Sequence, residues 1–212
     1  MGREFIEIFE EWALDYDKSV MGEHPQYVDV FANYDAILNQ VVQQSLGTVL
    51  EFGVGTGNLS NKLLNAGHNV IGIEPSEAMR NIASRKLPSM TILDGDFINY
   101  PYISVQIETI ASTYAFHHLS DIEKEIAIKK FASVLPRKGR IVFGDTMFKT
   151  EADKQLEIEK ALDKGFTDLA DDLNREYYPT LDIMKNAFEK HHFDVSFKQM
   201  NDFVWVITAD KK

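Results

Sequence analysis

The sequence predicts an α/β protein with a doubly wound, seven-stranded and mostly parallel sheet that carries helices on both faces. Between residues 47 and 145, short apolar segments alternate with amphipathic ones, which is typical of a parallel sheet. Two apolar segments near the C-terminus are joined by Asn201-Asp202 and predict a hairpin. We therefore expect an antiparallel strand at one edge of the sheet. With 212 residues, the chain is long enough for one domain with a large core.

The core elements follow one another with recognisable boundaries. Helices are expected at residues 58–66, where Gly67 provides a C-terminal stop, and from Ser76 onward. Another helix begins at Ser120, because Ser120-Asp121-Ile122-Glu123 has the form of a capping box. Strands are expected at residues 48–52, 70–74, 90–93, 108–113, 140–145, 193–199 and 203–209.

The spacing of apolar residues predicts which faces of the helices are buried. In the helix after Ser120, the expected buried residues are Ile122, Ile126, Phe131 and Val134. Residues 150–176 form a highly charged helix with a break at Gly165. Its expected buried side consists of Leu156, Ala161, Leu162, Phe166 and Leu169. Residues 3–45 are expected to form two or three helical pieces, broken near Gly22 and Pro25.

Composition and charge narrow the range of partners. The formal net charge is −11, and so acidic a protein is repelled by the phosphate backbone of nucleic acids. There are no cysteines, which excludes disulfides and thiolate metal sites. No apolar run reaches the roughly 18 residues of a membrane span, and the N-terminus has no apolar signal core. We therefore expect a soluble cytoplasmic protein, a monomer or homodimer, that binds neither nucleic acid nor membranes.

A glycine-rich loop follows the first predicted strand, in the stretch Val49-Leu50-Glu51-Phe52-Gly53-Val54-Gly55-Thr56-Gly57. The dinucleotide fingerprint is G-x-G-x-x-G, and here the third glycine comes one residue early. A phosphate loop needs a lysine after its last glycine, whereas Asn58 follows here. Glu51 would repel a pyrophosphate, and it fits a ligand with a positively charged amino or sulfonium group.

Three further segments end predicted parallel strands, where open α/β sheets bind their ligands. Glu74 ends the second strand, where a carboxylate can accept both hydroxyls of a ribose. Asp94-Gly95-Asp96-Phe97 follows the third strand, where a carboxylate and an aromatic ring can hold an adenine. Ser112-Thr113 ends the fourth strand, beside the expected reacting end of the ligand.

Together these segments resemble the class I S-adenosylmethionine-dependent methyltransferases, over roughly residues 47–145. More narrowly, "FEEWALDYDKSV" and "IASTYAFHHL" look like the YrrT-type bacterial group. The resemblance implies a Rossmann-like methyltransferase fold whose last strand is antiparallel, with S-adenosylmethionine as the cofactor. The segments that match in order and spacing are the glycine loop, Gly72-Ile73-Glu74-Pro75-Ser76, Asp94-Gly95-Asp96-Phe97 and Leu135-Pro136-Arg137-Lys138-Gly139-Arg140.

The resemblance also implies roles for individual residues. Gly53 and Gly55 would approach the amino acid portion of the cofactor, and Ser112 would support its methionine end. Glu74 would hold the ribose hydroxyls, and Asp96 and Phe97 would contact the adenine. The complete set of expected cofactor-binding residues is Glu51, Gly53, Gly55, Glu74, Pro75, Asp96, Phe97 and Ser112.

The same resemblance divides the single domain, residues 1–212, into four parts. Residues 1–45 would be an N-terminal helical lid, and residues 47–145 the cofactor-binding core. Residues 146–180 would be a helical insertion that caps the substrate. Residues 181–212 would supply the final helix and the hairpin.

Aromatic and histidine residues mark the expected side of the methyl acceptor. Trp12 and Tyr16 are four residues apart, so they share a helix face that either packs on the domain or closes over the methyl donor. Aromatic faces attract a cation such as the sulfonium. Tyr16 and His117 are the candidate catalytic residues, and we expect at most one of His117 and His118 to face the site.

Asp145 and Tyr177 are further candidates for contact with the acceptor. Asp145 ends the fifth strand and could be one metal ligand. The fourth strand, however, ends in Ser112-Thr113 and not in carboxylates, so no metal site is predicted.

The predicted function is the transfer of a methyl group from S-adenosylmethionine to a small molecule, by in-line displacement. No basic groove or repeat offers a surface for a macromolecular acceptor. Two alternatives remain open: a non-catalytic module that binds S-adenosylmethionine or S-adenosylhomocysteine, and a nicotinamide-dependent dehydrogenase. Against the second alternative, no tyrosine is followed four residues later by lysine.

Overall fold

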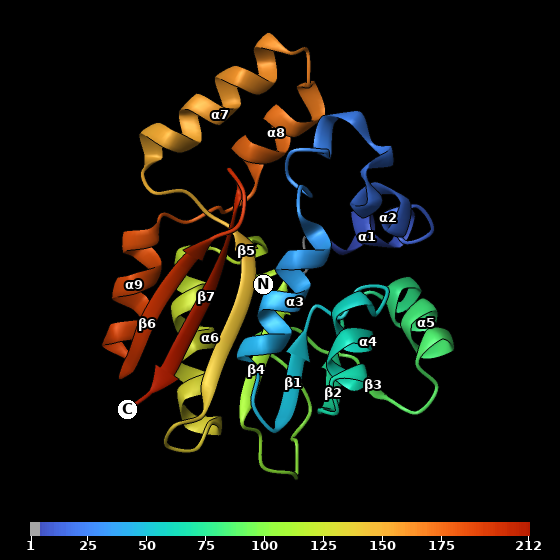
Figure 1. The fold of residues 1–212 in the computed structure, drawn as a ribbon, viewed down its shortest axis with the longest axis vertical. Coiled ribbons are helices and arrows are strands. Elements are labelled where there is room, and N and C mark those ends of the chain that lie inside the picture. The colour runs from blue at the N-terminus through green and yellow to red at the C-terminus, as the bar shows by residue number, and fades with distance from the viewer. Residues whose placement is uncertain (1–4) are drawn as a thin grey trace.

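The computed structural model describes residues 5–212 and contains a seven-stranded sheet flanked by helices (Figure 1). Residues 1–4, where the predicted lid begins, lie outside the described part of the chain. The strand order is β3-β2-β1-β4-β5-β7-β6. The strands are β1 (Thr48–Phe52), β2 (Asn69–Ile73), β3 (Thr91–Leu93), β4 (Thr109–Thr113), β5 (Arg140–Thr146), β6 (Phe193–Gln199) and β7 (Val204–Lys211).

The C-terminal hairpin completes the sheet, with β7 antiparallel to both β5 and β6. The predicted antiparallel edge hairpin is confirmed, although its antiparallel strand β7 lies one place in from the edge, which β6 forms. Burial explains the order. Every residue of β7 from Val204 to Ile207 is buried, whereas β6 alternates between buried or half-buried and exposed residues over most of its length. The more apolar strand therefore takes the interior position.

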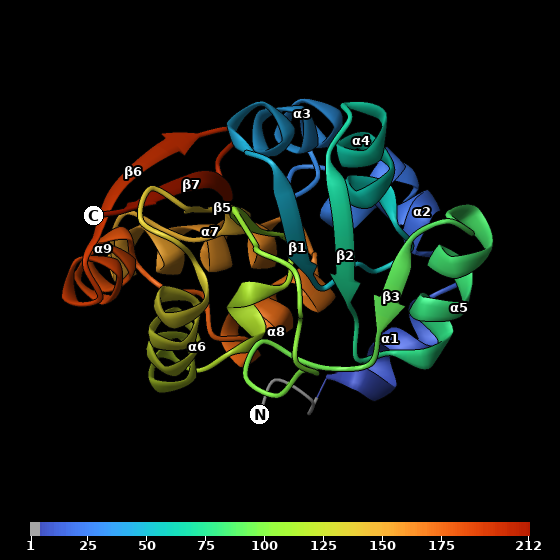
Figure 2. The same ribbon diagram turned by 90° about the horizontal axis from the view of Figure 1, so that it is seen from below.

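Helices cover both faces of the sheet, which confirms the doubly wound architecture (Figure 2). On one face, α3 (Tyr34–Gln44) and α4 (Asn58–Asn65) share a hydrophobic cluster with Val49 of β1. On the other face, α6 (Asp121–Val134) and α9 (Leu181–Lys190) share a second cluster with Leu50. Neighbouring residues of one strand thus face different layers, as the pleat of a strand requires.

Helix α6 begins with the predicted capping box at Ser120 and Glu123, but its predicted buried face is largely wrong. Of the predicted residues, Phe131 is fully buried, whereas Ile122, Ile126 and Val134 are exposed. The buried stripe is Lys124, Ala127, Ile128 and Phe131. This stripe has the same helical spacing, and its first position is a lysine, which hides it from a search for apolar residues.

The charged segment forms two helices, α7 (Glu151–Asp163) and α8 (Thr167–Arg175), which pack on each other. Ala161 and Leu169 are buried as predicted, but Leu156 and Leu162 are exposed. Ile158, Ala170 and Leu173 complete the buried side. Figure 1 shows α7 at the outer end of the molecule, beside α8.

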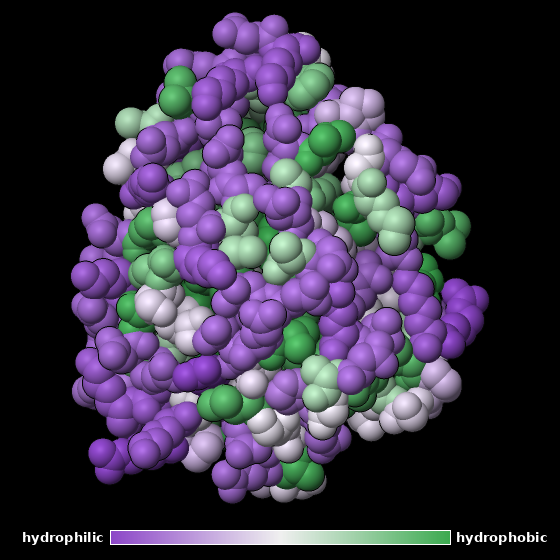
Figure 3. All heavy atoms as spheres, in the orientation of Figure 1, coloured by the Kyte–Doolittle hydropathy of each residue, from purple (hydrophilic) through white to green (hydrophobic). Residues whose placement is uncertain are grey.

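The remaining short helices are α1 (Ile6–Trp12), α2 (Tyr16–Lys18), a π-helical turn η1 (Ser19–Glu23), a 3₁₀ turn η2 (Pro25–Tyr27), α5 (Glu77–Lys86) and η3 (Phe116–His118). Figure 1 shows α1, α2, α7 and α8 together beyond one end of the sheet. No helix within residues 5–212 is long and apolar enough to cross a membrane. The face in Figure 3 is mostly hydrophilic, with hydrophobic residues in scattered groups.

Candidate active site

The glycine loop between β1 and α4 adopts a backbone that side chains rarely tolerate. Gly53, Gly55 and Gly57 have φ values of +66°, +56° and +90°, in the left-handed region that favours glycine. A Cβ atom on Gly53 would also lie 2.6 Å from the Cβ atom of Ala115. The first glycine is therefore required both by its dihedral angles and by the close approach of the loop after β4.

Glu74 ties the glycine loop to the end of β2. Its Oε2 accepts a 2.8 Å hydrogen bond from the Gly55 N–H, and its Oε1 accepts a 2.9 Å bond from the Ser76 N–H. Burial raises the pKa of Glu74 to about 7, although these two backbone donors lower it. A buried carboxylate that holds the loop in this way is ready to accept further hydrogen bonds from a ligand.

Most of the predicted cofactor-binding residues meet in one place, which we call the cofactor cleft. Gly53, Gly55, Glu74, Pro75, Asp96 and Phe97 all line it. Asp96 Oδ1 accepts hydrogen bonds from the backbone N–H groups of Ile98 and Asn99, which shapes the loop after β3. Residues of the N-terminal segment and of the loop after β4 complete the lining, among them Ile6, Phe9, Tyr16, Tyr114 and His118.

Glu51 and Ser112 do not line the cleft and are both buried. Glu51 Oε2 accepts a 2.6 Å hydrogen bond from the Ser60 hydroxyl, and its Oε1 has no partner. The Ser112 hydroxyl is also buried without a partner. It is 3.8 Å from the position that a Cβ atom on Gly53 would take. Ser112 thus lies next to the first glycine of the loop, whereas Glu51 is bonded to α4.

Glu51→Gln is expected to stabilise the ligand-free protein at alkaline pH. Burial raises the pKa of Glu51 to about 8, although the Ser60 hydroxyl lowers it. The unfolded chain releases this proton near pH 4.5. Between pH 4.5 and 8 the folded state therefore binds more protons than the unfolded state, so the free energy of unfolding falls as pH rises toward 8. Urea unfolding at pH 5, 7 and 8.5 should show that the free energy of unfolding of the variant, relative to that of the wild type, increases as pH rises. A constant difference across this range would contradict the assignment.

The N-terminal helices are fastened to the elements that form the cofactor cleft. Glu10 of α1 accepts hydrogen bonds from the Ser76 hydroxyl and the Ala78 N–H, at the start of α5. Asp17 of α2 accepts from the Thr56 hydroxyl at 2.6 Å, and it also pairs with Lys86. Acidic side chains near a helix N-terminus are electrostatically favourable, so Glu10 adds to the stability of α5.

A second hollow, which we call the aromatic cavity, opens beside the cofactor cleft and has a volume of about 440 Å³. The two share Phe9, Tyr16, Tyr114 and His118 in their walls. The lining of the aromatic cavity includes the rings of Phe5, Phe9, Trp12, Tyr16, Tyr27, Phe31, Tyr114, Tyr178 and Phe203. Carboxylates from α8 and its end face the same space, namely Asp168, Asp172 and Glu176.

The structure separates the predicted acceptor residues. Trp12, Tyr16 and His117 line the aromatic cavity. Tyr177 is 42% exposed and is not part of the lining, whereas its neighbour Tyr178 is. Asp145 lies behind the cavity wall, where it contacts His117.

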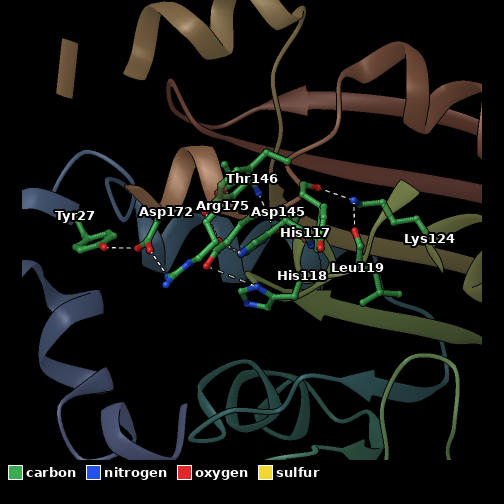
Figure 4. A network of polar contacts seen from close by, with 12 residues as sticks. Tyr27, His117, His118, Leu119, Lys124, Asp145, Thr146, Asp172 and Arg175 are labelled. Carbon is green, nitrogen blue, oxygen red and sulfur yellow. Dashed lines mark hydrogen bonds and ion pairs between the residues drawn. The ribbon is translucent and has the colours of Figure 1, made fainter. Parts of the chain in front are cut away.

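The prediction that at most one histidine faces the site is wrong, because both line the aromatic cavity. They lie on η3, whose tight turn directs neighbouring side chains to the same hollow. His117 is fixed on both sides. Its Nδ1 is 2.5 Å from Asp145 Oδ1 (Figure 4). Its Nε2 is 3.3 Å from Glu176 Oε2. Burial alone would lower the pKa of His117, but these carboxylates raise it to about 10. Burial and charged His117 lower the pKa of His118 to about 3.

Three residues of this network are missed by sequence reasoning. Glu176 ends a segment whose charges indicate a solvated helix. Its place in the site becomes visible only through its contact with His117, which is distant in the sequence. Tyr114 has a φ of +52°, and no local pattern predicts that conformation. Lys124 is 1% exposed, and it donates to the backbone carbonyl of Leu119 (Figure 4). It also donates to the backbone carbonyl of Tyr177 at 2.6 Å. It joins η3 to the segment that carries Glu176.

Comparison with known proteins agrees with this geometry. A family model described as a methyltransferase domain matches residues 49–139. An uncharacterized methyltransferase of Oceanobacillus iheyensis is 63% identical over 211 residues, covering 100% of this chain and 99% of the relative. One of Geobacillus kaustophilus is 54% identical with the same coverage. The magnesium protoporphyrin IX methyltransferase of Synechocystis PCC 6803, with bound S-adenosylmethionine, has the same fold. Its TM-score is 0.72 at 16% identity, over 100% of this chain and 97% of that one.

The fold and the cleft at the carboxyl ends of its parallel strands define a class I S-adenosylmethionine-dependent methyltransferase. With relatives this similar over its whole length, the chain belongs to the methyltransferase family. The nicotinamide-dependent alternative is therefore wrong.

Proposed function

We propose that this methyltransferase acts on a small-molecule acceptor, which occupies the aromatic cavity while S-adenosylmethionine occupies the cofactor cleft. The observation that carries the proposal is the shared wall of the two hollows. Phe9, Tyr16, Tyr114 and His118 line both. A donor methyl group at this wall would face the cavity directly, as in-line displacement needs.

The cofactor would lie across the carboxyl ends of β1, β2 and β3. Glu74 would accept the ribose hydroxyls, and Asp96 and Phe97 would hold the adenine. Gly53 and Gly55 would leave room for the amino acid portion. Glu51 would contribute indirectly, because it is buried outside the lining of the cleft and accepts a hydrogen bond from Ser60 of α4.

The acceptor would be small, since the cavity is about 440 Å³ and is walled by side chains on several sides. Methyl transfer from a sulfonium mainly requires orientation and the exclusion of water. Orientation can supply about 7–11 kcal/mol of the barrier. The aromatic rings would provide both, and Tyr16 would close the site from the lid.

A metabolite screen tests the proposal. The purified protein is mixed with S-adenosylmethionine and a cell extract, split by ultrafiltration into small-molecule and macromolecular fractions. We expect S-adenosylhomocysteine to form only with the small-molecule fraction, and mass spectrometry to show a product heavier by one methyl group. Methylation of the macromolecular fraction would contradict the small-molecule acceptor. Binding of S-adenosylhomocysteine without turnover in either fraction would favour the non-catalytic module.

Trp12→Ala is expected to raise the KM for the acceptor and to leave S-adenosylhomocysteine affinity unchanged. Trp12 lines the aromatic cavity but not the cofactor cleft. Steady-state kinetics and calorimetry would measure the two effects. Leu14→Ala is the matched control, because Leu14 lies on the same segment and is exposed. If the two substitutions changed the KM for the acceptor equally, the assignment of Trp12 to the acceptor site would be wrong.

A further inference from the structure

Three side chains with metal-ligating atoms meet at one wall of the aromatic cavity. His117 and His118 come from η3, and Glu176 directly follows α8. One ligand atom from each lies within 4.8 Å of the other two. His117 Nε2 is 3.3 Å from Glu176 Oε2, and His118 Nδ1 is 3.9 Å from Glu176 Oε1.

The Nδ1 atom of His118 has no hydrogen-bond partner. The His118 side chain is 10% exposed, and its Nδ1 is buried. Buried polar atoms in folded proteins nearly always have a partner, so an orphan atom at a cavity wall points to a ligand.

Asp145 orients the imidazole ring of His117. Its Oδ1 contacts His117 Nδ1, and its Oδ2 accepts a 3.0 Å hydrogen bond from the His117 N–H (Figure 4). Its Oδ1 also accepts from the Thr146 N–H at 2.8 Å. The carboxylate is thereby fixed, and it leaves His117 Nε2 facing Glu176. Metal-binding histidines usually donate their other ring nitrogen to a carboxylate in this way.

The charges around the cluster leave room for a cation. Asp145 and Glu176 contact His117 directly, and Asp172 lines the same cavity. The nearby cations are already engaged: His117 pairs with Asp145 and Glu176, Arg175 pairs with Asp172, and Lys124 donates to backbone carbonyls. A divalent ion would displace the proton on His117 Nε2 into solvent, because metal ligands bind in their deprotonated form, and would then balance these carboxylates itself.

We propose that His117 Nε2, His118 Nδ1 and Glu176 bind a divalent transition-metal ion such as zinc. Around a tetrahedral zinc ion with ligands at about 2.0–2.2 Å, two ligand atoms lie roughly 3.3–3.6 Å apart. The His117–Glu176 separation of 3.3 Å already has this value. The separations to His118 are longer and would shorten as the ion draws its ring inward. Two histidines and one carboxylate leave a coordination position open to the cavity.

The open position would face the acceptor, since His118 lines both the cofactor cleft and the aromatic cavity. A bound ion stabilises the deprotonated form of an oxygen or nitrogen nucleophile. The acceptor would lose its proton to water, and its lone pair would form the bond to the methyl carbon. The electrons of the broken carbon–sulfur bond would remain on sulfur, giving S-adenosylhomocysteine. This role rests on the proposed function, whereas the binding of the ion does not.

Titration with metal tests the site without any turnover. The full-length protein is stripped with EDTA and titrated with ZnCl₂ by calorimetry, and CoCl₂ serves as a probe whose visible absorption reports coordination geometry. We expect one ion per chain and a tetrahedral cobalt spectrum. His118→Ala should abolish both. Asp145→Asn should weaken binding by about ten- to a hundred-fold, as loss of an orienting partner does.

Two further variants keep the result interpretable. Glu176→Gln retains size and removes only the charge, so loss of binding in a folded Glu176→Gln protein, verified by circular dichroism, supports the site. His191→Ala is the matched control, because His191 pairs with Glu125 and does not line the aromatic cavity, so this variant should bind zinc as the wild type does. Absence of saturable binding to the wild type, or undiminished binding to His118→Ala, would overturn the inference. Neither outcome would bear on S-adenosylhomocysteine binding, which tests the proposed function separately.

Discussion

Glu74→Ala is expected to weaken S-adenosylhomocysteine binding by about ten- to a hundred-fold, since a hydrogen bond to a charged group is worth about 1.5–3 kcal/mol. The substitution removes the proposed acceptor of the ribose hydroxyls. It also frees the N–H groups of Gly55 and Ser76, which Glu74 holds at 2.8 and 2.9 Å. Isothermal titration calorimetry at pH 8 would measure the loss, because at that pH the carboxyl group, with its pKa of about 7, is mostly ionised.

The matched control is Glu77→Ala. Glu77 lies three residues further along, in the first turn of α5, and is exposed to solvent. Its removal changes the net charge by the same amount and should leave the dissociation constant unchanged. If Glu74→Ala bound S-adenosylhomocysteine as tightly as Glu77→Ala does, the ribose assignment would be wrong.

Phe97→Ala is expected to lower the free energy of unfolding by about 3–5 kcal/mol, as the truncation of a buried phenylalanine does. The Phe97 ring stacks on Phe52 at a centroid distance of 5.3 Å and meets Phe116 edge-on at 5.1 Å. Because the ring also lines the cofactor cleft, S-adenosylhomocysteine should bind more weakly as well. Urea unfolding and calorimetry below the transition would measure the two effects.

Phe188→Ala separates stability from binding. Phe188 lies on α9, is fully buried, and belongs to the same hydrophobic cluster as Phe97, but it does not line the cofactor cleft. Its truncation should cost a similar free energy and leave the affinity unchanged. Equal losses of affinity in the two variants would mean that Phe97 acts only through general destabilisation.

The sequence predicts this fold well because its signals are local. Strand boundaries fall within about two residues of those observed, since each strand is a short apolar run bounded by turn residues. The glycine loop is equally local: positive φ values at Gly53, Gly55 and Gly57 need glycine whatever surrounds them. Glu74 and Asp96 follow from their places at strand ends, where topology alone brings side chains together.

The errors arise where distant contacts decide. Two apolar stripes on α6 compete, and the buried one includes Lys124, whose ammonium group reaches carbonyls at Leu119 and Tyr177. The role of Glu176 depends on His117, which lies far away in the sequence. The position of β7 between β5 and β6 likewise depends on how the strands pair across the sheet. The residues of one strand alone do not determine that pairing.

The interior position of β7 has a consequence for the order of folding. Seven residues of β5 pair with β7, from Arg140 with Asp210 to Thr146 with Val204. Until β7 has been synthesised, the ladder along β5 stays open, and Asp145 lacks the neighbour Trp205 that flanks it in the finished sheet. Long-range pairings form late and leave edges exposed in the meantime. Assembly of the wall that holds His117 therefore waits until residues 204–211 have been synthesised.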